Sequence, residues 1–462
     1  MLVMKFGGTS LGDAQRIAAV AEMVGDNENR TVVVVSAMKG ATDSLIKAAR
    51  AAAEGQDIVY RTITAEILDR HLETVDKLLA ESAERPHLVG FIEDRLHGLD
   101  RLCRSIAVLG ELTVRGSDAV ASIGEELSAQ ILAATLRDRG THAQAISATE
   151  LIVTDDSFGA ANPLMDATAS RVRERLIPLL GHGVTPVVTG YVASTVDGVT
   201  TTLGRGGSDY SAAILGACLD ADEVWIWTDV DGILTADPNI VQEAQTLTEL
   251  SYDEAAALAY FGADVLHPKT IKPVVEKGIP LRIVNSFNPS HPGTLIVKKP
   301  RSDRQTVPAI ISTTNLCLIS VAGNGETWTP QVAARALHRL AESGVDVLMF
   351  SQSFSEHSLN LVIRDLDQAH CLRVLRREFD ADLKLGQLSH LDAQGQVGTV
   401  SVVGAPGRNG ASIVPLAFAA LGRAGTRVIS VAQASSEYNV SFVIPADDVE
   451  DTVRSMHREL GL

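Results

Sequence analysis

The chain has 462 residues, of which 45% are hydrophobic and 21% are charged, with 57 acidic and 40 basic side chains. A chain of this length predicts roughly three domains, each able to bury a core. The formal net charge of −17 argues against nucleic acid and anionic membranes as partners. It does not exclude an anionic substrate, because a local basic site can oppose the overall charge.

The predicted elements of the first 300 residues alternate between strands and helices. Residues 2–6 read as a short strand, and Asp13 is expected to open a helix that runs to about Val24. Residues 43–139 are predicted to be mostly helical, and 293–303 read as a polar linker. Further apolar strands are predicted at 31–38, 184–192, 223–230 and 280–286. This pattern indicates an α/β domain with a mainly parallel sheet over residues 1–300.

The remainder of the chain contains an internal repeat. The string FSQSFSEHSLNLVI (350–363) returns as VAQASSEYNVSFVI (431–444), which places Gln352 and Gln433 81 residues apart. Each copy reads as strand, helix, strand, strand and helix, which predicts two ferredoxin-like βαββαβ domains at 305–390 and 391–462. No catalytic nucleophile, metal cluster or phosphate loop stands out in either copy, so we interpret the pair as sensors.

The equivalent glycines Gly344 and Gly425 follow the predicted helix of each copy. Glycine is the usual residue just past a helix, because it adopts a positive φ there at no steric cost.

The cysteines and the amino terminus bear on the cellular location. No C-x-x-C motif occurs, so we expect reduced thiols, no disulfide framework and no metal centre built from side chains. We also expect no signal peptide, because a strand begins at once, and no apolar run reaches the roughly 20 residues that span a membrane. These features predict a cytoplasmic protein. The cysteines are Cys103, Cys218, Cys317 and Cys371.

The string KFGGTS (5–10) places Lys5 at the end of the first strand, before Gly7 and Gly8. Ligands of open α/β sheets bind at the carboxyl ends of the strands, where glycine N–H groups and a lysine can hold a phosphate. A tight turn without ligand remains the alternative. The phosphate-binding pattern G-x-x-x-x-G-K-[ST] does not occur, which excludes a P-loop protein.

A second glycine-rich loop, TTLGRGGSDYSAA (201–213), surrounds Arg205 with glycines just before a predicted helix. The first turn of a helix offers unpaired N–H groups and a partial positive charge. Together with the guanidinium, it predicts an anion site.

Three further strings carry polar candidates. In WTDVDGILTADP (227–238), Thr228, Asp229 and Asp231 end a strand, where they would hold Mg²⁺ through water or fix a ribose, or else form a solvated acidic turn. In SIGEELSAQ (122–130), Glu125 is expected at a helix start, as a ligand or as a capping acid. The turn SAMKGATDS (36–44) offers Ser36 and Thr42. Outside these strings, His267 reads as a packed or capping residue.

Taken in order, these motifs resemble those of aspartokinases, members of the amino-acid-kinase family that end in a pair of ACT domains. The resemblance includes VMKFGGTS, VVVVSAMKGATD, IGEELSA, TTLGRGGSDYSAA, WTDVDG with TADP, and LAYFGADVLHPKTIKP, and it covers nearly the whole chain. It implies an aspartate kinase that uses ATP and Mg²⁺ to convert the β-carboxylate of L-aspartate to 4-phospho-L-aspartate, the first step of lysine, threonine and methionine biosynthesis. It also implies feedback by lysine, threonine or both at the ACT domains, and a homodimer or higher homo-oligomer.

The resemblance further implies a role for each matching residue. Arg205 would bind the α-carboxylate of aspartate, Glu125 the α-ammonium, and Thr42 with Ser36 the side-chain carboxylate. Tyr191, Ser208 and Asp209 would complete the substrate site, and Lys5, Gly8 and Asp209 would act in catalysis. The nucleotide site would comprise Lys5, Phe6, Gly7, Gly8, Ser10, Thr228, Asp229, Leu234 and Asp237. The effector site would comprise Gln352, Ser353, Glu356, Gln433 and Glu437.

Three residues on the nucleotide side depart from the family pattern. Leu234 and Asn239 stand where tyrosine and arginine are usual, and Asp264 replaces a lysine that normally faces the transferred phosphoryl group. These departures keep open a second function: a kinase-derived regulatory or amino-acid-binding protein with weak or lost phosphoryl transfer. A kinase for another acidic amino acid is disfavoured, because the string from Arg205 to Asp209 is intact.

Overall fold

The computed structural model describes residues 1–462 except 28–29, 261–265, 267, 301–308, 324–329, 354–356, 405–412 and 434–438. The chain divides into two compact units. Unit 1 comprises residues 1–233, 248–252 and 264–300, and unit 2 comprises 234–247, 253–263 and 301–462. Two segments of the predicted first domain, 234–247 and 253–263, thus belong to the second unit.

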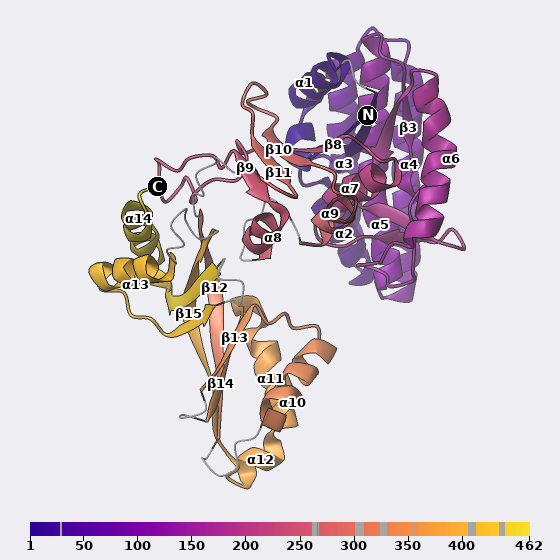
Figure 1. The fold of residues 1–462 in the computed structure, drawn as a ribbon. Helices are drawn as coiled ribbons and strands as arrows, with labels where there is room; N and C mark the ends of the chain where they lie inside the picture. The colour runs from indigo at the N-terminus through magenta and orange to yellow at the C-terminus, as the bar shows by residue number, and fades with distance from the viewer. Residues whose placement is uncertain are drawn as a thin grey trace. The chain divides into compact units, whose positions relative to one another are not determined.

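Unit 1 is built on an eight-stranded sheet with the order β3-β5-β2-β1-β8-β10-β11-β9. Figure 1 labels β3, β8, β9, β10 and β11 of this sheet. The first six strands in this order, β3 through β10, are parallel, so their carboxyl ends lie at one edge of the sheet. Strand β11 runs antiparallel to β10. The strands are β1 (Leu2–Phe6), β2 (Thr31–Val35), β3 (Ala143–Ile146), β5 (Thr185–Thr189), β8 (Glu223–Thr228), β9 (Glu249–Ser251), β10 (Leu281–Asn285) and β11 (Thr294–Val297). The predicted α/β fold with a mainly parallel sheet is confirmed.

Helices cover the sheet on both faces. Alternate residues of β1, namely Leu2, Met4 and Phe6, pack into a core with α1 to α5. Val3 points the other way, where the close approach of α7 requires glycine: a Cβ on Gly216 would lie 2.5 Å from Val224. The helices of this part of the chain are α1 (Ala14–Gly25), α2 (Ala41–Ala53), α3 (Asp57–Leu79), α4 (Arg85–Leu109), α5 (Val114–Asp138), α6 (Met165–Gly181), α7 (Gly207–Cys218), α8 (Tyr252–Tyr260) and α9 (Pro268–Lys277).

Two features of unit 1 complete the frame around the sheet. Three further strands form a separate small sheet and come from the part of the sequence between β3 and β8: β4 (Val153–Thr154), β6 (Val192–Thr195) and β7 (Thr200–Thr202). The 3-10 helix η1 (Gly8–Leu11) follows β1 directly, and Asp13 caps α1 by accepting a hydrogen bond from the Arg16 N–H, as predicted.

The prediction of a linker at 293–303 is wrong for residues 294–297. Residues 294–297 form β11, which pairs with β10 after a tight turn. Gly293 permits this turn, since it has a φ of +66° and a Cβ there would lie 1.9 Å from the Ile283 carbonyl oxygen. The strand is short and runs directly into the basic residues KKPRSD, and this polar, basic character is what predicted a linker.

Unit 2 contains a six-stranded antiparallel sheet with the order β13-β14-β12-β15-β17-β16. Figure 1 labels β12, β13, β14 and β15 of this sheet. Two long strands, β12 (Ala309–Gly323) and β15 (Leu388–Val403), pair with each other along both repeats. The other elements are β13 (Met349–Ser353), β14 (Ser358–Arg364), β16 (Ser430–Gln433), β17 (Asn439–Pro445), α10 (Pro330–Glu342), α11 (Gln368–Glu378), α12 (Asp380–Lys384), α13 (Ile413–Ala424) and α14 (Val449–Leu460). The predicted ferredoxin-like repeat is confirmed, as are the positive φ values of Gly344 and Gly425 just past their helices.

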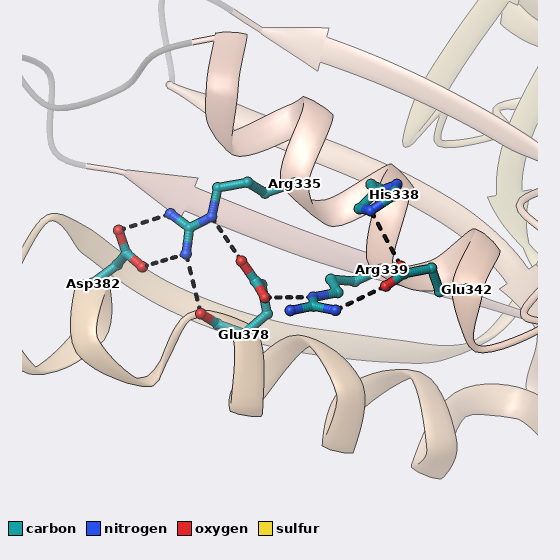
Figure 2. Close-up of polar contacts among 6 residues, drawn as sticks. All are labelled: Arg335, His338, Arg339, Glu342, Glu378 and Asp382. Carbon is teal, nitrogen blue, oxygen red and sulfur yellow. Dashed lines mark hydrogen bonds and ion pairs between the residues drawn. The ribbon is translucent and has the colours of Figure 1, made fainter.

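The helices of the first repeat are joined by an ion-pair network (Figure 2). Arg335 on α10 donates to Glu378 at 2.7 Å and to Asp382 at 3.0 and 3.2 Å. Arg339, one turn further along α10, bonds Glu378 and Glu342. The network therefore ties α10 to the end of α11 and to α12.

Candidate active site

A cavity of about 520 Å³ opens in unit 1 at the carboxyl edge of the sheet. Its walls come from the segments that follow β1, β2 and β5, from α5, and from the loop before α7. Nine residues predicted from the sequence line it: Lys5, Gly8, Ser36, Thr42, Glu125, Tyr191, Arg205, Ser208 and Asp209. The structure therefore brings together the predicted substrate site and part of the predicted phosphate site.

Lys5 and Asp209 form an ion pair inside this cavity. Strand alternation turns Lys5 to the same face of the sheet as Val3, the face that α7 covers. Asp209 lies in the first turn of α7, where the helix dipole favours a carboxylate. Its Oδ1 is 2.6 Å from the Lys5 Nζ, and both side chains are largely buried. A cation is thereby held at the place where the sequence predicts a phosphate.

The loop that carries Arg205 has a backbone conformation that only glycine adopts without strain. Gly204 and Gly206 have φ values of +76° and +69°. A Cβ on Gly207 would lie 2.6 Å from the Tyr191 ring. These constraints place an exposed guanidinium at the cavity in front of the amino terminus of α7.

Glu125 lies in the middle of α5, so its predicted position at a helix start is wrong, and so is the capping alternative. Its place in the helix was mispredicted because α5 is one uninterrupted helix of 25 residues, whereas its place in the substrate site was predicted by resemblance. Its side chain is only 3% exposed. Burial raises the pKa of its carboxyl to about 8, although a backbone hydrogen bond at Ala37 opposes the shift.

One carboxyl oxygen of Glu125 has no hydrogen-bond partner among the residues that the structure describes. Its Oε2 is buried, and no residue in the described part of the chain bonds it. A buried oxygen without a partner is costly. Because Glu125 lines the cavity, a cationic group of a ligand would satisfy this oxygen and restore the charge of the carboxylate.

The turn after β2 packs tightly against its neighbours. A Cβ on Gly124 would lie 2.7 Å from Ala37, and one on Gly8 would lie 3.0 Å from the Ala37 carbonyl oxygen. Ser36 donates its backbone N–H to Phe6 at 3.1 Å. The glycines therefore let two loops and α5 converge on the cavity wall.

Several predicted nucleotide residues do not line the cavity. Phe6 is a core residue that stacks on Trp227, with ring centroids 5.7 Å apart. Ser10 is buried, and its hydroxyl bonds that of Ser286 at 2.8 Å. Thr228 and Asp229 bond each other at the end of β8, at 3.3 Å. Leu234 and Asp237 belong to unit 2. Their roles at a nucleotide stay predictions, as does that of Gly7.

Other predicted residues are placed as follows. Gln352 and Ser353 lie on β13 and Gln433 ends β16, so these effector candidates occupy the two edge strands of the sheet. Glu356, Glu437, Asp264 and His267 lie outside the described residues.

Asp118 was missed by the sequence analysis. It is buried on α5 and accepts hydrogen bonds from the Gly159 N–H at 2.8 Å, from the Thr202 N–H at 3.2 Å and from the Thr202 hydroxyl at 2.7 Å. Since Gly159 lines the cavity, Asp118 supports its wall. The partners are 41 and 84 residues away, so no local pattern signals the contact.

Comparison with known families agrees with this architecture. Residues 1–285 match the model of the amino acid kinase family, and residues 319–379 and 400–460 each match that of the ACT domain. The chain belongs to the amino acid kinase family.

Relatives identify the branch. The chain is 35% identical over its full length to half of the bifunctional aspartokinase/homoserine dehydrogenase 2 of Arabidopsis thaliana, and it spans about half the length of such bifunctional relatives. It is 32% identical to Arabidopsis aspartokinase 3, with 98% of this chain and 80% of that protein covered. Within its family, the chain is an aspartokinase relative over nearly its whole length.

Solved structures agree. Escherichia coli aspartokinase III with aspartate and ADP matches with a TM-score of 0.82 at 29% identity, with both chains fully covered. The same enzyme with lysine and aspartate matches with a TM-score of 0.80, also at 29% identity, with 100% of this chain and 99% of that chain covered. In the part of this chain that the structure describes, no helix is long and apolar enough to cross a membrane.

Proposed function

We propose that the chain transfers the γ-phosphoryl group of ATP to the β-carboxylate of L-aspartate and is inhibited by an amino acid at its ACT repeat. One observation carries the proposal: a single cavity presents an exposed guanidinium, Arg205, and a buried carboxyl with a free oxygen, Glu125. These groups complement the α-carboxylate and the α-ammonium of an amino acid. The related Escherichia coli enzyme was solved with aspartate and ADP.

The reaction needs no general base. An aspartate carboxylate has a pKa of about 4 and is already ionised at neutral pH. Its oxygen attacks the γ-phosphorus in line, the bond to the bridging oxygen of ADP breaks, and an acyl phosphate forms. The protein contributes alignment and positive charge. Lys5 lies in the cavity beside Asp209 and would supply that charge to the phosphate oxygens.

Magnesium is expected to arrive with the nucleotide. The described residues contain no cluster of His, Cys, Asp or Glu that could hold a metal ion by itself. This fits Mg²⁺, whose ligands at nucleotide sites are mostly phosphate oxygens and water. Asp209 is the acidic lining residue paired with Lys5, and it would contact the hydrated ion. When bound, the ion offsets the charge of the phosphates.

The regulatory part of the proposal rests on the repeat. The Escherichia coli relative was solved with lysine, and we expect lysine, threonine or both to bind at the edge strands that carry Gln352 and Gln433. A homodimer or higher homo-oligomer and a cytoplasmic location stay predictions. The alternative of a regulatory protein without kinase activity is not favoured, because the predicted aspartate site is assembled in one cavity.

The test is a hydroxamate assay, in which hydroxylamine traps the acyl phosphate. With MgATP, we expect hydroxamate from L-aspartate and none from L-glutamate or N-acetyl-L-glutamate. Product from no acidic amino acid, with a folded protein that still binds L-aspartate, would instead support the regulatory protein.

A further inference from the structure

Two separate loops contribute to the wall of the cavity that contains Lys5. The first follows β1 and covers residues 7–12, and the second follows β2 and covers residues 36–40. Gly8 of the first loop and Ser36, Lys39 and Gly40 of the second line the cavity. They touch where Gly8 approaches the Ala37 carbonyl.

The two loops have little direct connection. Among the described residues, no backbone hydrogen bond joins residues 7–12 to 37–40. The loops rest on adjacent strands, and the Ser36 N–H bonds the Phe6 carbonyl oxygen at 3.1 Å just before the first loop. Between the loops themselves the contact at Gly8 is van der Waals, so a polar tie from another element would add to the restraint on their spacing.

Arg70 spans the two loops from outside the cavity. It lies on α3, and its Nη1 donates to the Lys39 carbonyl oxygen at 2.7 Å. Its Nη2 donates to the Gly12 carbonyl oxygen at 2.9 Å. The planar guanidinium holds its two donors at a fixed spacing. A single rigid group therefore sets the distance between the two loop ends.

We propose that Arg70 is a positioning residue for phosphoryl transfer, which aligns the loop predicted to hold the phosphates with the loop next to the predicted acceptor site. The inference rests on the proposed function, because it assigns phosphate contacts to Gly7 and Gly8 and acceptor contacts to Ser36 and Thr42. Arg70 does not line the cavity, so it acts through these loops. Displacement of reacting groups by about 1 Å costs on the order of 100-fold in rate.

The expected signature is a loss of turnover with binding largely kept. Arg70→Ala should lower kcat by about ten-fold or more, while the KM values for aspartate and ATP change by less than about three-fold. Arg70→Lys should remain impaired, since one ammonium cannot reproduce the planar fork that reaches both carbonyls. Millimolar guanidinium chloride should partly restore kcat to Arg70→Ala, whereas sodium chloride at the same concentration should not.

Arg139 supplies the matched control. It also joins distant segments, donating to the Ala18 carbonyl at 2.9 Å and pairing with Glu22 at 3.0 Å, but it does not line the cavity or contact either loop. Arg139→Ala should therefore leave kcat unchanged even if it lowers the melting temperature. An equal fall in kcat in both variants, or an Arg70→Ala kcat within two-fold of the wild type, would overturn the proposal.

Hydrogen–deuterium exchange on the full chain separates this inference from the proposed function. Residues 7–12 and 36–40 should exchange faster in Arg70→Ala and Arg70→Lys than in Arg139→Ala. Unchanged exchange in these loops would refute the clamp even in an active enzyme. If the wild type forms no acyl phosphate, the proposed function fails, and faster exchange would still establish that Arg70 holds the loops together.

Discussion

The cavity of unit 1 and the α10–α11 network of unit 2 use charged side chains in opposite ways. In unit 1 the cavity contains a buried ion pair, Lys5 with Asp209, and a buried carboxyl, Glu125, whose pKa is raised to about 8. In unit 2 the network around Arg335 is partly exposed and its members satisfy one another (Figure 2). Buried charge without full satisfaction costs stability and indicates a ligand site, whereas mutually paired surface charge contributes little.

The two repeats of unit 2 differ in a similar way. The positions 81 residues after Arg335 and Arg339 are Leu416 and Ala420, so the second repeat lacks the network. Its helices instead share an apolar core with Ala236 and Val241 of segment 234–247. The same fold thus joins α10 to α11 and α12 through a charged network in one copy and holds a segment from between β8 and β9 in the other.

The largest effect is expected from the exposed cation of the cavity. Arg205→Ala removes a charged hydrogen-bond donor, which costs about 2–3 kcal/mol. The aspartate KM should rise by about 30- to 150-fold, while the ATP KM should change by less than about three-fold. Initial-rate kinetics with each substrate varied in turn measure both. Arg175→Ala, which removes a surface pair with Glu150, is the control, and an unchanged aspartate KM in Arg205→Ala would remove Arg205 from the substrate site.

Glu125→Gln should abolish the pH dependence of aspartate binding. With a pKa of about 8, the carboxyl is mostly protonated at pH 7 and must ionise to meet an ammonium. The wild-type Kd should therefore fall by up to about ten-fold per pH unit between pH 6 and pH 8. The variant should bind weakly at every pH. Glu126→Gln removes the neighbouring carboxylate that pairs with Arg95, and it should keep the pH dependence and move it only slightly to lower pH, because repulsion by Glu126 is the smallest contribution to the raised Glu125 pKa.

The Glu125→Gln variant should also be more stable than the wild type. Because the folded-state pKa of Glu125 lies above its ordinary value of 4.5, the stability contribution of its protonated form is complete below that value and is lost as the pH rises through about 8. The melting temperature of Glu125→Gln should therefore exceed that of the wild type, and the difference should grow from pH 5 to pH 8. A difference that shrinks over this range would contradict the raised pKa.

An intermediate effect is expected at Thr235, which ties segment 234–247 to the second repeat. Its hydroxyl accepts from the Gln245 N–H at 3.0 Å and bonds His457 on α14 at 3.2 Å. Its carbonyl accepts from the Ile310 N–H at 2.7 Å. The segment also carries Leu234 and Asp237, the predicted nucleotide residues. We therefore expect Thr235→Val to shift the half-inhibitory concentration of L-lysine or L-threonine, whichever inhibits the wild type, by about three- to ten-fold.

The matched control for Thr235 is Ser401→Ala, which breaks the buried hydroxyl pair with Ser441 in the same repeat, 2.7 Å apart. It should lower the melting temperature without shifting inhibition. Equal shifts in both variants would mean that inhibition follows the stability of the repeat and does not depend on the anchored segment.

How much of the fold and of the site could be predicted depends on how far apart in the sequence the contacting residues lie. The strand ends, the glycine loops and Arg205 lie in short contiguous motifs, so the local sequence pattern was enough to predict them. Glu125 was identified through resemblance but was placed at a helix start, because nothing in the helical pattern of 43–139 shows that it lies buried in the middle of a long helix. Arg70 contacts loops 31 and 58 residues away, and no sequence pattern signals such contacts. The membership of 234–247 in unit 2 likewise depends on packing against Ile310 and against residues of the second repeat, all of which lie far along the chain.

The smallest effect is expected from the surface network. Arg335→Met should cost about 0.5–1 kcal/mol, and the cost should shrink at high salt, because the pairs are partly exposed. Hydrogen bonds from Arg339 and Arg335 lower the pKa of Glu378, so this contribution is present above the ordinary carboxyl pKa and is lost as the pH falls. Melting curves at low and high salt measure it. A fall in kcat would show that the network does more than join α10 to α11.

Calorimetric titration with aspartate and two truncated analogues tests the central claim most directly. Succinate lacks the ammonium of aspartate, and β-alanine lacks its α-carboxylate. Our account predicts that Arg205→Ala weakens binding of L-aspartate and succinate but leaves β-alanine unchanged, and that Glu125→Gln weakens L-aspartate and β-alanine but leaves succinate unchanged or improved. If Arg205→Ala weakened β-alanine as much as L-aspartate, Arg205 would not contact the α-carboxylate, and the proposed assignment of the cavity would be wrong.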